Sequence, residues 1–359
     1  MKKQKKSLLI NYSLIYSFLT VHLLIDVRTS CLSDIVHLYY AETWADTWIK
    51  IHPHDTISFL AHEWDPVEKY PCVFLARKKR FFEQKIAAHA SGPDRIISFS
   101  KLPPIDTSIP IILHVFDLSD TLYPLYERGW TAHQIYTHGE KKRIKTAKHI
   151  IVHAPEIWAH LHELYGIDEE RISTVPYLTS ERKDIFLQKT FLPQGIQDSY
   201  FLTECTPWEE WHPLELLRSY AHYIHDFGGN TKLILLWDLG ENLGMISAII
   251  RSLDIIDSVK IVGILSREDR ETLYAHAKGW LYTGAYYTRG ASIELANTYT
   301  LPLFISEITW LEWYPAQYIH PNHIDTLASL LAKEHPNIKI QRIIQNDIII
   351  NTYKRIIAW

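Results

Sequence analysis

The chain has 359 residues, of which 47% are apolar and 22% are charged, and 37 basic and 41 acidic side chains give a formal net charge of −4. This length accommodates two domains with cores of their own. The composition is that of a folded globular protein and excludes a disordered chain. The slightly acidic balance excludes broad affinity for nucleic acid. Three scattered cysteines, Cys31, Cys72 and Cys205, form no disulfide framework and no metal spacing, which favours a reducing compartment.

The first 25 residues combine a lysine-rich start with a run free of charged side chains. The run at residues 7–25 has the length of a signal peptide or a membrane anchor. It contains several polar residues, however, and no small-residue cleavage site follows it. Residues 20–28 fit a first buried strand better, so we interpret residues 1–19 as an extension of a cytoplasmic protein. The lysines allow at most peripheral contact with the inner face of a membrane. If residues 7–25 do form an anchor, the alternative is a membrane-anchored binding protein.

Short apolar runs alternate with helical patterns through the first half of the chain, which predicts an α/β domain with a parallel sheet. The expected helices cover residues 32–50, 83–90, 132–146 and 156–165. The expected strands cover residues 20–28, 56–61, 95–99, 109–115, 149–153 and 172–175. An interdomain linker is expected near residues 179–199. The first domain is therefore predicted to span residues 20–185.

The second half of the chain has the same alternation, most clearly in residues 259–306. This stretch predicts a strand, a helix, a strand, a turn, a helix that opens at Ser292 and ends before Pro302, and a last strand. Such βαβαβ units form parallel sheets, which bind ligands beyond the carboxyl ends of their strands, where helix N-termini present free N–H groups. Arg289, Gly290 and an N-cap Ser292 suit an anion at this turn. The alternative is an ordinary capped helix with a surface arginine.

The framework of both halves resembles the group 1 glycosyltransferases of the GT-B fold. Residues 147–178 are similar to the family pattern A-D-x-I-I-x-V-S, then L-x-x-x-y-G, then I-x-V-I-P. Residues 200–212, Y-F-L-T-E-C-T-P-W-E-E-W-H, resemble Y-i-L-x-V-G-x-x-x-x-R-K-N. Residues 259–277 resemble v-x-F-x-G-x-v-x-x-x-x-L-x-x-l-Y-x-x-A. The resemblance covers about residues 20–359.

This resemblance implies two Rossmann-like domains whose parallel sheets face each other across a cleft. The second domain would span residues 186–340, and residues 341–359 would return to the first domain as a strand or helix. The implied activity is transfer of a hexose from a nucleotide-sugar donor to a glycan or lipid-linked acceptor, without a metal or other cofactor. None of the 20 histidines has a metal-binding spacing.

The residues that carry the family's chemistry differ in this chain. Glu210, Trp211 and His212 stand where the pattern has Arg-Lys-Asn, and Tyr287 and Leu295 stand where it has two glutamates. An acid in place of a cation repels a diphosphate by about 1–4 kcal/mol at 4 Å. The remaining candidates for the donor pocket are Trp211, His212, Arg289, Gly290, Ser292 and Glu294.

On the acceptor side, Phe116 occupies the position of the family's catalytic histidine. Asp117 follows it, and His114 lies two residues earlier, on the same face of the expected strand. The resemblance therefore makes His114 and Asp117 the catalytic candidates. Structural readings remain open: Asp117 could hold a loop, and Glu294 could simply suit the helix dipole.

The loss of so many motif positions at once supports a second hypothesis, a non-catalytic GT-B protein that acts as a partner or scaffold of an active glycosyltransferase. Aromatic side chains able to form an interface are present at Trp208, Trp211, Trp310 and Trp313.

Overall fold

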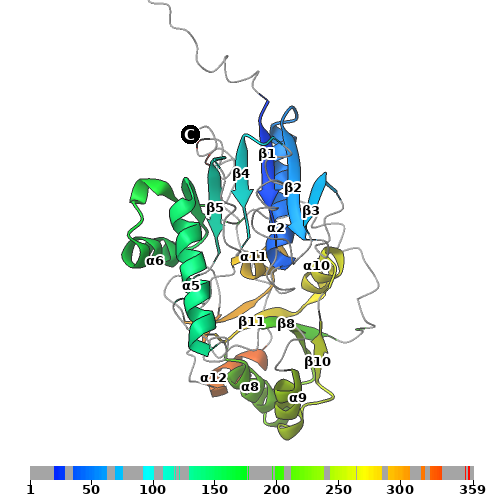
Figure 1. Cartoon of the computed structure of the whole chain (residues 1–359). Helices are drawn as coiled ribbons and strands as arrows, with labels where there is room; N and C mark the ends of the chain where they lie inside the picture. Colours follow the sequence, from blue (N-terminus) through cyan, green and yellow to red (C-terminus); the bar gives the residue numbers. More distant parts are fainter. Residues whose placement is uncertain are drawn as a thin grey trace, which may run out of the picture.

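The computed structural model describes residues 20–28, 35–62, 69–75, 92–100, 108–116, 118, 121, 129–175, 177, 196, 199–205, 212–237, 243–263, 265–284, 290–307, 317–319, 324–333, 352 and 355. Within them the chain forms two parallel sheets, each covered by helices (Figure 1). The strands of the first sheet lie between residues 22 and 174, and those of the second between residues 200 and 319. The predicted boundary at residue 185 lies outside the described residues.

The first sheet has seven strands in the order β3-β2-β1-β4-β5-β6-β7, and every neighbouring pair is parallel. These strands are β1 (His22–Asp26), β2 (Thr56–His62), β3 (Cys72–Leu75), β4 (Arg95–Ser98), β5 (Ile111–Val115), β6 (His149–Val152) and β7 (Ile172–Thr174). The strand order reverses direction between β1 and β4. Ligands of open α/β sheets bind at such a reversal, beyond the carboxyl ends of the strands.

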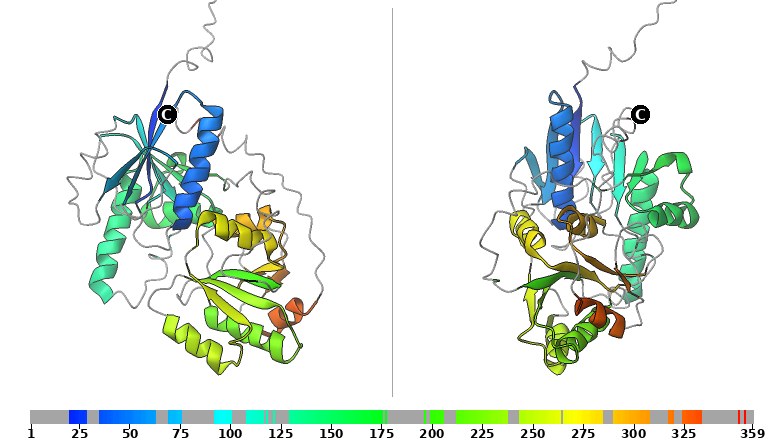
Figure 2. Two further views of the ribbon diagram at one scale, coloured as in Figure 1. Left: turned by 90° about the vertical axis from the view of Figure 1, so that its right-hand side faces the viewer. Right: turned by 180° about the vertical axis from the view of Figure 1, so that it is seen from behind.

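Helices cover both faces of the first sheet (Figure 2). Side chains alternate between the two faces along each strand, so each strand contributes apolar residues to both layers of helices. The helix α2 (Ile35–Ile51) lies on one face, and α5 (Gly129–Thr146) and α6 (Pro155–Tyr165) lie on the other. Leu23, Ile25 and Val27 pack with the aromatic rings of α2. Leu24, between them, belongs to a separate cluster on the opposite face. A short 3₁₀ helix, η4 (Glu169–Arg171), leads into β7.

The second sheet has six parallel strands in the order β10-β9-β8-β11-β12-β13. They are β8 (Tyr200–Cys205), β9 (Lys232–Trp237), β10 (Val259–Val262), β11 (Gly279–Tyr282), β12 (Leu303–Ser306) and β13 (Gln317–Ile319). Its reversal of strand order falls between β8 and β11. The helices are α8 (Pro213–His225), α9 (Leu243–Ser252), α10 (Arg267–His276), α11 (Gly290–Thr298) and α12 (Ile324–Leu331).

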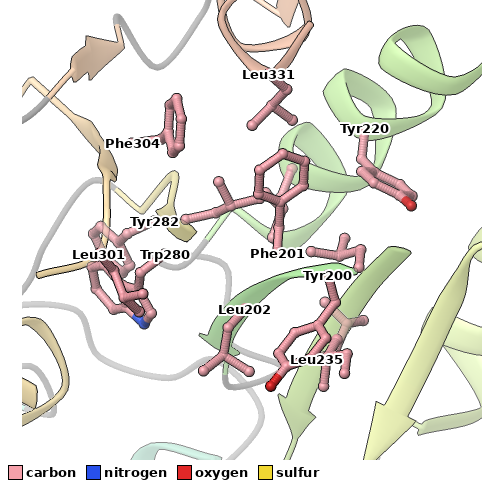
Figure 3. Packing of buried hydrophobic residues seen from close by; sticks show 14 of the residues in the cluster. Tyr200, Phe201, Leu202, Tyr220, Leu235, Trp280, Tyr282, Leu301, Phe304 and Leu331 are labelled. Carbon is pink, nitrogen blue, oxygen red and sulfur yellow. The ribbon is translucent and has the colours of Figure 1, made fainter. Parts of the chain in front are cut away.

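Figures 1 and 2 place α10 and α11 on the side of the second sheet that faces the first sheet, and α8, α9 and α12 on the other side. The buried apolar side chains of the second sheet pack against the helices on both of these sides (Figure 3). Phe201 contacts Tyr223 of α8 with ring centroids 5.9 Å apart. Tyr200, which precedes Phe201 on β8, points to the opposite face of the sheet, where its hydroxyl donates to the Leu273 carbonyl of α10 at 2.8 Å.

The structure confirms the predicted α/β fold and the strand-helix alternation of residues 259–306, and it adds elements that the sequence patterns did not predict. The strand β3 is a four-residue edge strand between charged segments, too short to show alternation. The elements α9, β13 and α12 were also not predicted. The expected helix at residues 83–90 and the expected returning segment at residues 341–359 fall on residues outside those described, apart from 352 and 355. In the described part of the chain, no helix is long and apolar enough to cross a membrane.

Candidate functional site

The carboxyl ends of β8 and β11 carry the candidate site of the second sheet, because the strand order reverses between them. The helix α11 begins at Gly290, after β11, and α8 begins at Pro213, after β8. The first N–H groups of each helix have no partner within it and carry partial positive charge. An anionic ligand is therefore favoured at this edge.

A largely buried ion pair joins three elements at this edge. The Nε and Nη2 atoms of Arg270, on α10, donate to Oε1 and Oε2 of Glu204 at the end of β8, over 2.5 and 2.9 Å. Nη2 also donates to Oγ of Ser292, in the first turn of α11, at 3.3 Å. The Ser292 hydroxyl in turn donates to Glu204 Oε2. The side chains of Arg270 and Glu204 are only 11% and 15% exposed, so the pair is largely withdrawn from water.

The charges of this pair support each other. Burial alone would raise the pKa of Glu204, but the Arg270 guanidinium and the hydrogen bonds from Arg270 and Ser292 lower it below its ordinary value. Burial would likewise lower the pKa of Arg270, and the charge of Glu204 outweighs it and raises that pKa. Both groups are therefore ionised. The Tyr274 ring, 5.2 Å from the guanidinium carbon, covers the pair from within α10.

His212 lies at the start of α8, the helix that follows β8. It is the N-cap residue, with φ 46° and ψ 49°, a left-handed conformation that is uncommon outside glycine. The hydroxyl of Thr283, which follows β11, donates to the His212 carbonyl at 3.2 Å. Nδ1 of the His212 ring lies 3.7 Å from Oε2 of Glu215. The structure thus brings His212 to the reversal point, where its strained backbone is held from the neighbouring strand.

The helix α11 carries the other described candidates of the donor side. It begins two residues earlier than predicted, so Ser292 is not the N-cap residue but lies inside the first turn, 2% exposed. Glu294, two residues further along, is 6% exposed. The structure therefore brings Gly290 and Ser292 to the edge formed by Glu204 and Arg270. Arg289 and Trp211 lie outside the described residues.

The corresponding edge of the first sheet holds a pair of histidines. Nδ1 of His153, after β6, lies 2.7 Å from the Val175 carbonyl, and its Nε2 lies 3.1 Å from Nδ1 of His114 on β5. A carbonyl only accepts, so His153 carries its proton on Nδ1 and accepts at Nε2. His114 must then donate from Nδ1. Burial lowers the pKa of His153 to about 3, so this ring stays neutral at physiological pH.

Aromatic rings enclose these histidines. His114 is 1% exposed and stacks on Phe99 with centroids 4.1 Å apart. Tyr177 stacks on His153 at 4.1 Å. Phe116 lies on the same face as His114, 6.0 Å away, as the alternation of the strand predicts. Asp117 lies outside the described residues.

The reversal point of the first sheet, between β1 and β4, is also occupied by charged side chains. Arg28 donates to both carboxylate oxygens of Asp26, at 2.7 and 2.9 Å, and the Ser98 hydroxyl donates to Asp26 at 3.1 Å. Arg28 and Asp26 are 1% and 2% exposed. The Ser100 hydroxyl donates to the Arg28 carbonyl at 2.6 Å. These charges hold the chain where it leaves β1.

Sequence reasoning missed Glu204, Arg270 and His153. One signal was present for the first two: Glu204 stands at the Val of Y-i-L-x-V-G, and Arg270 at the first Leu of L-x-x-l-Y. When a chain has opposite charges at two positions where the family pattern is apolar, the two side chains are expected to form a buried pair. His153 gave no comparable signal. No group of three or more His, Cys, Asp or Glu able to hold a metal occurs among the described residues.

No protein-family model matches the chain, and no curated protein sequence matches it. Solved structures do resemble it. One is WaaG, a glycosyltransferase of lipopolysaccharide biosynthesis, with 14% identity over 86% of this chain and 89% of that one and a TM-score of 0.64. Another is HepE of Anabaena in complex with UDP and glucose, with 13% identity, coverages of 87% and 89%, and a TM-score of 0.60.

A third is the sucrose-phosphate synthase of Thermosynechococcus elongatus, with 14% identity, coverages of 86% and 88%, and a TM-score of 0.60. All three are GT-B glycosyltransferases, and each match spans both sheets. At these identities the likeness establishes the architecture. The chain has the GT-B fold, as the resemblance of its sequence patterns predicted.

Proposed function

We propose that this protein binds a nucleotide sugar at the carboxyl edge of its second sheet and transfers the sugar to a glycan or lipid-linked acceptor. The observation that carries the proposal is the start of α11 at the β8–β11 reversal point, with a largely buried guanidinium reaching its first turn. The fold it shares with HepE, whose structure holds UDP and glucose, supports the same ligand class.

The donor diphosphate would lie at the first turn of α11, near Gly290 and Arg289. Ser292 would shape this turn through its bond to Glu204. Trp211 and His212 would line the nucleotide side, and Glu294 the sugar side. Electrostatic stabilisation of the leaving diphosphate by the helix and cations needs no metal, so the reaction proposed is metal-independent transfer of a hexose.

On the acceptor side, Asp117 would orient the acceptor hydroxyl. His114 is 1% exposed, so its role would be to hold the end of β5 through His153. For a lipid-linked acceptor, the basic residues at the start of the chain would favour a position at the inner face of a membrane.

One observation favours a second candidate function, a non-catalytic partner of another glycosyltransferase. Phe116 stands at the position of the family's catalytic histidine, and it is 4% exposed within the aromatic cluster around His114 and His153. A buried phenyl ring transfers no proton. Nucleotide binding without sugar transfer would fit this candidate.

The proposal is tested by calorimetric titration of UDP and by transfer assays with a panel of UDP, GDP and ADP sugars. Gly290→Asp adds a carboxylate at the first position of α11, which suits the helix dipole but repels a diphosphate. At about 1 kcal/mol or more for charges 4 Å apart, binding should weaken at least fivefold. Gly290→Asn is the matched control for bulk. Gly244→Asp, in the first turn of α9 on the opposite face, is the control for an added acid.

Binding that Gly290→Asp weakens and both controls preserve supports the donor site. Sugar transfer by the wild type then distinguishes an enzyme from a non-catalytic partner. If no nucleotide binds at millimolar concentration, or if all three variants bind like the wild type, the donor site is not where we place it.

A further inference from the structure

The contact between Arg270 and Glu204 has the geometry of a guanidinium with a phosphate. A carboxylate and a phosphate both accept two parallel N–H bonds from the planar edge of an arginine. Here Glu204 accepts from Nε and Nη2 of Arg270. It also accepts from the Ser292 hydroxyl at the first turn of α11. The carboxylate therefore makes, inside the protein, contacts that an anionic ligand at this helix would make.

Arg270 keeps hydrogen-bonding capacity in this arrangement. A guanidinium has five N–H donors, and the bonds to Glu204 and Ser292 use Nε and Nη2. Within the described part of the chain, Nη1 takes part in no hydrogen bond with another residue. Its two N–H groups are thus available to a ligand beside the first turn of α11.

Arg270 supplies a positive charge to a site that lacks the two cations of the family pattern. The two cations of the family pattern are replaced by Glu210 and Trp211, so the loop after β8 does not supply them. The chain instead carries a cation on α10, where the pattern has leucine. Glu204 neutralises it, because both groups are ionised and their atoms are 2.5 Å apart at the nearest approach.

We propose that Arg270 is a further cation, beside Arg289, that this chain presents to the donor diphosphate, and that Glu204 is a positioning residue that orients its guanidinium and weakens its hold on anions. This inference rests on the proposed donor site and adds a residue that binds the phosphates. It assigns to α10 a role that the sequence pattern gives to the loop after β8. It also implies modest affinity for the free nucleotide, because the ligand competes with a resident carboxylate.

The test is calorimetric titration of UDP into the wild type, Glu204→Gln and Glu204→Gln/Arg270→Gln. Glutamine keeps an oxygen that accepts from Arg270 and Ser292 but removes the negative charge. Glu204→Gln should therefore bind UDP about tenfold more tightly than the wild type, or 1.4 kcal/mol. The double variant differs from it only in the cation and contains no unpaired buried charge, so it should fold. It should bind at least tenfold more weakly than Glu204→Gln, and its affinity should depend less on salt.

The outcomes separate this inference from the proposed function. If the wild type binds UDP and both variants match it within twofold, the donor site stands and the role of Arg270 and Glu204 is overturned. If only Glu204→Gln binds, Arg270 holds phosphate only after the carboxylate is removed, so the native chain binds no nucleotide and both proposals are overturned. If none of the three binds, both proposals fall. Circular dichroism of each variant confirms that a loss of binding is not a loss of folding.

Discussion

Replacing Arg270 by leucine leaves the Glu204 carboxylate buried without its counter-ion. Removing one partner of a buried ion pair costs about 3–5 kcal/mol, because the remaining charge has lost both water and its partner. Glu204→Val alone strands the Arg270 guanidinium in the same way. The two side chains are 15% and 11% exposed, so little solvent reaches either charge. Each single variant should therefore lose about 3–5 kcal/mol of unfolding free energy.

The double variant Glu204→Val/Arg270→Leu restores the apolar residues of the family pattern and should lose much less. Apolar replacement of a buried pair is often neutral or stabilising. The Ser292 hydroxyl, however, loses its acceptor, at about 1–3 kcal/mol. The losses of unfolding free energy of the two single variants add to about 6–10 kcal/mol, whereas the double variant should lose about 0–3 kcal/mol. The double-mutant cycle should therefore give a coupling energy of at least about 3 kcal/mol between the two residues.

The assay is urea denaturation combined with hydrogen exchange of peptides from β8 and α11, which reports the second domain separately. The pH dependence provides a further check. In the wild type the pKa of Glu204 is lowered, so its contribution is present above its ordinary value of 4.5 and is lost as the pH falls through the folded pKa. In Arg270→Leu, burial without the counter-ion should raise the pKa of Glu204. The loss of unfolding free energy of this variant relative to the wild type should therefore become smaller as the pH falls. A loss below about 1 kcal/mol for Arg270→Leu would mean that the pair is solvated, and the reasoning would fail.

Two further predictions concern the first sheet and the packing of α8. The pKa of His153 is lowered to about 3, below its unfolded value, so stability should fall as the pH drops from about 6.5 toward 3. The melting temperature of His153→Phe should depend much less on pH over this range. An unchanged pH dependence would contradict the neutral state of the buried His153 ring. Gly229→Ala would place its Cβ 2.2 Å from the Tyr223 ring, which should cost about 1–3 kcal/mol. Gly244→Ala meets nothing within 4 Å and should stabilise α9 by up to about 1 kcal/mol. Equal melting temperatures for these two variants would refute the packing argument.

The fold was predictable because it depends on the alternation of apolar residues within each strand and on the spacing of the apolar runs along the chain. Leu23, Ile25 and Val27 share the face that packs on α2, as strand alternation requires, and His114 shares a face with Phe116 for the same reason. Sequences that keep such runs at regular distances can form only a few topologies. The short edge strand β3 escaped prediction because four residues between charged segments show no periodicity.

The site was less predictable, because its contacts join residues far apart in the chain. Ser292 has the residue type of an N-cap, but the helix begins at Gly290 and the hydroxyl donates to Glu204, 88 residues away. No local rule reports that bond. The histidine pair was hidden for the same reason, since His114 and His153 meet only once β5 and β6 pair.

Hydrogen exchange with and without saturating UDP shows directly whether a nucleotide binds at the reversal point between β8 and β11. Binding at the proposed donor site should protect amides in the first turn of α11 and at the end of β8, and leave those of α9 and α12 unchanged. Protection confined to other elements, or none at all at saturation, would contradict the assignment of the nucleotide-sugar site to the reversal point between β8 and β11.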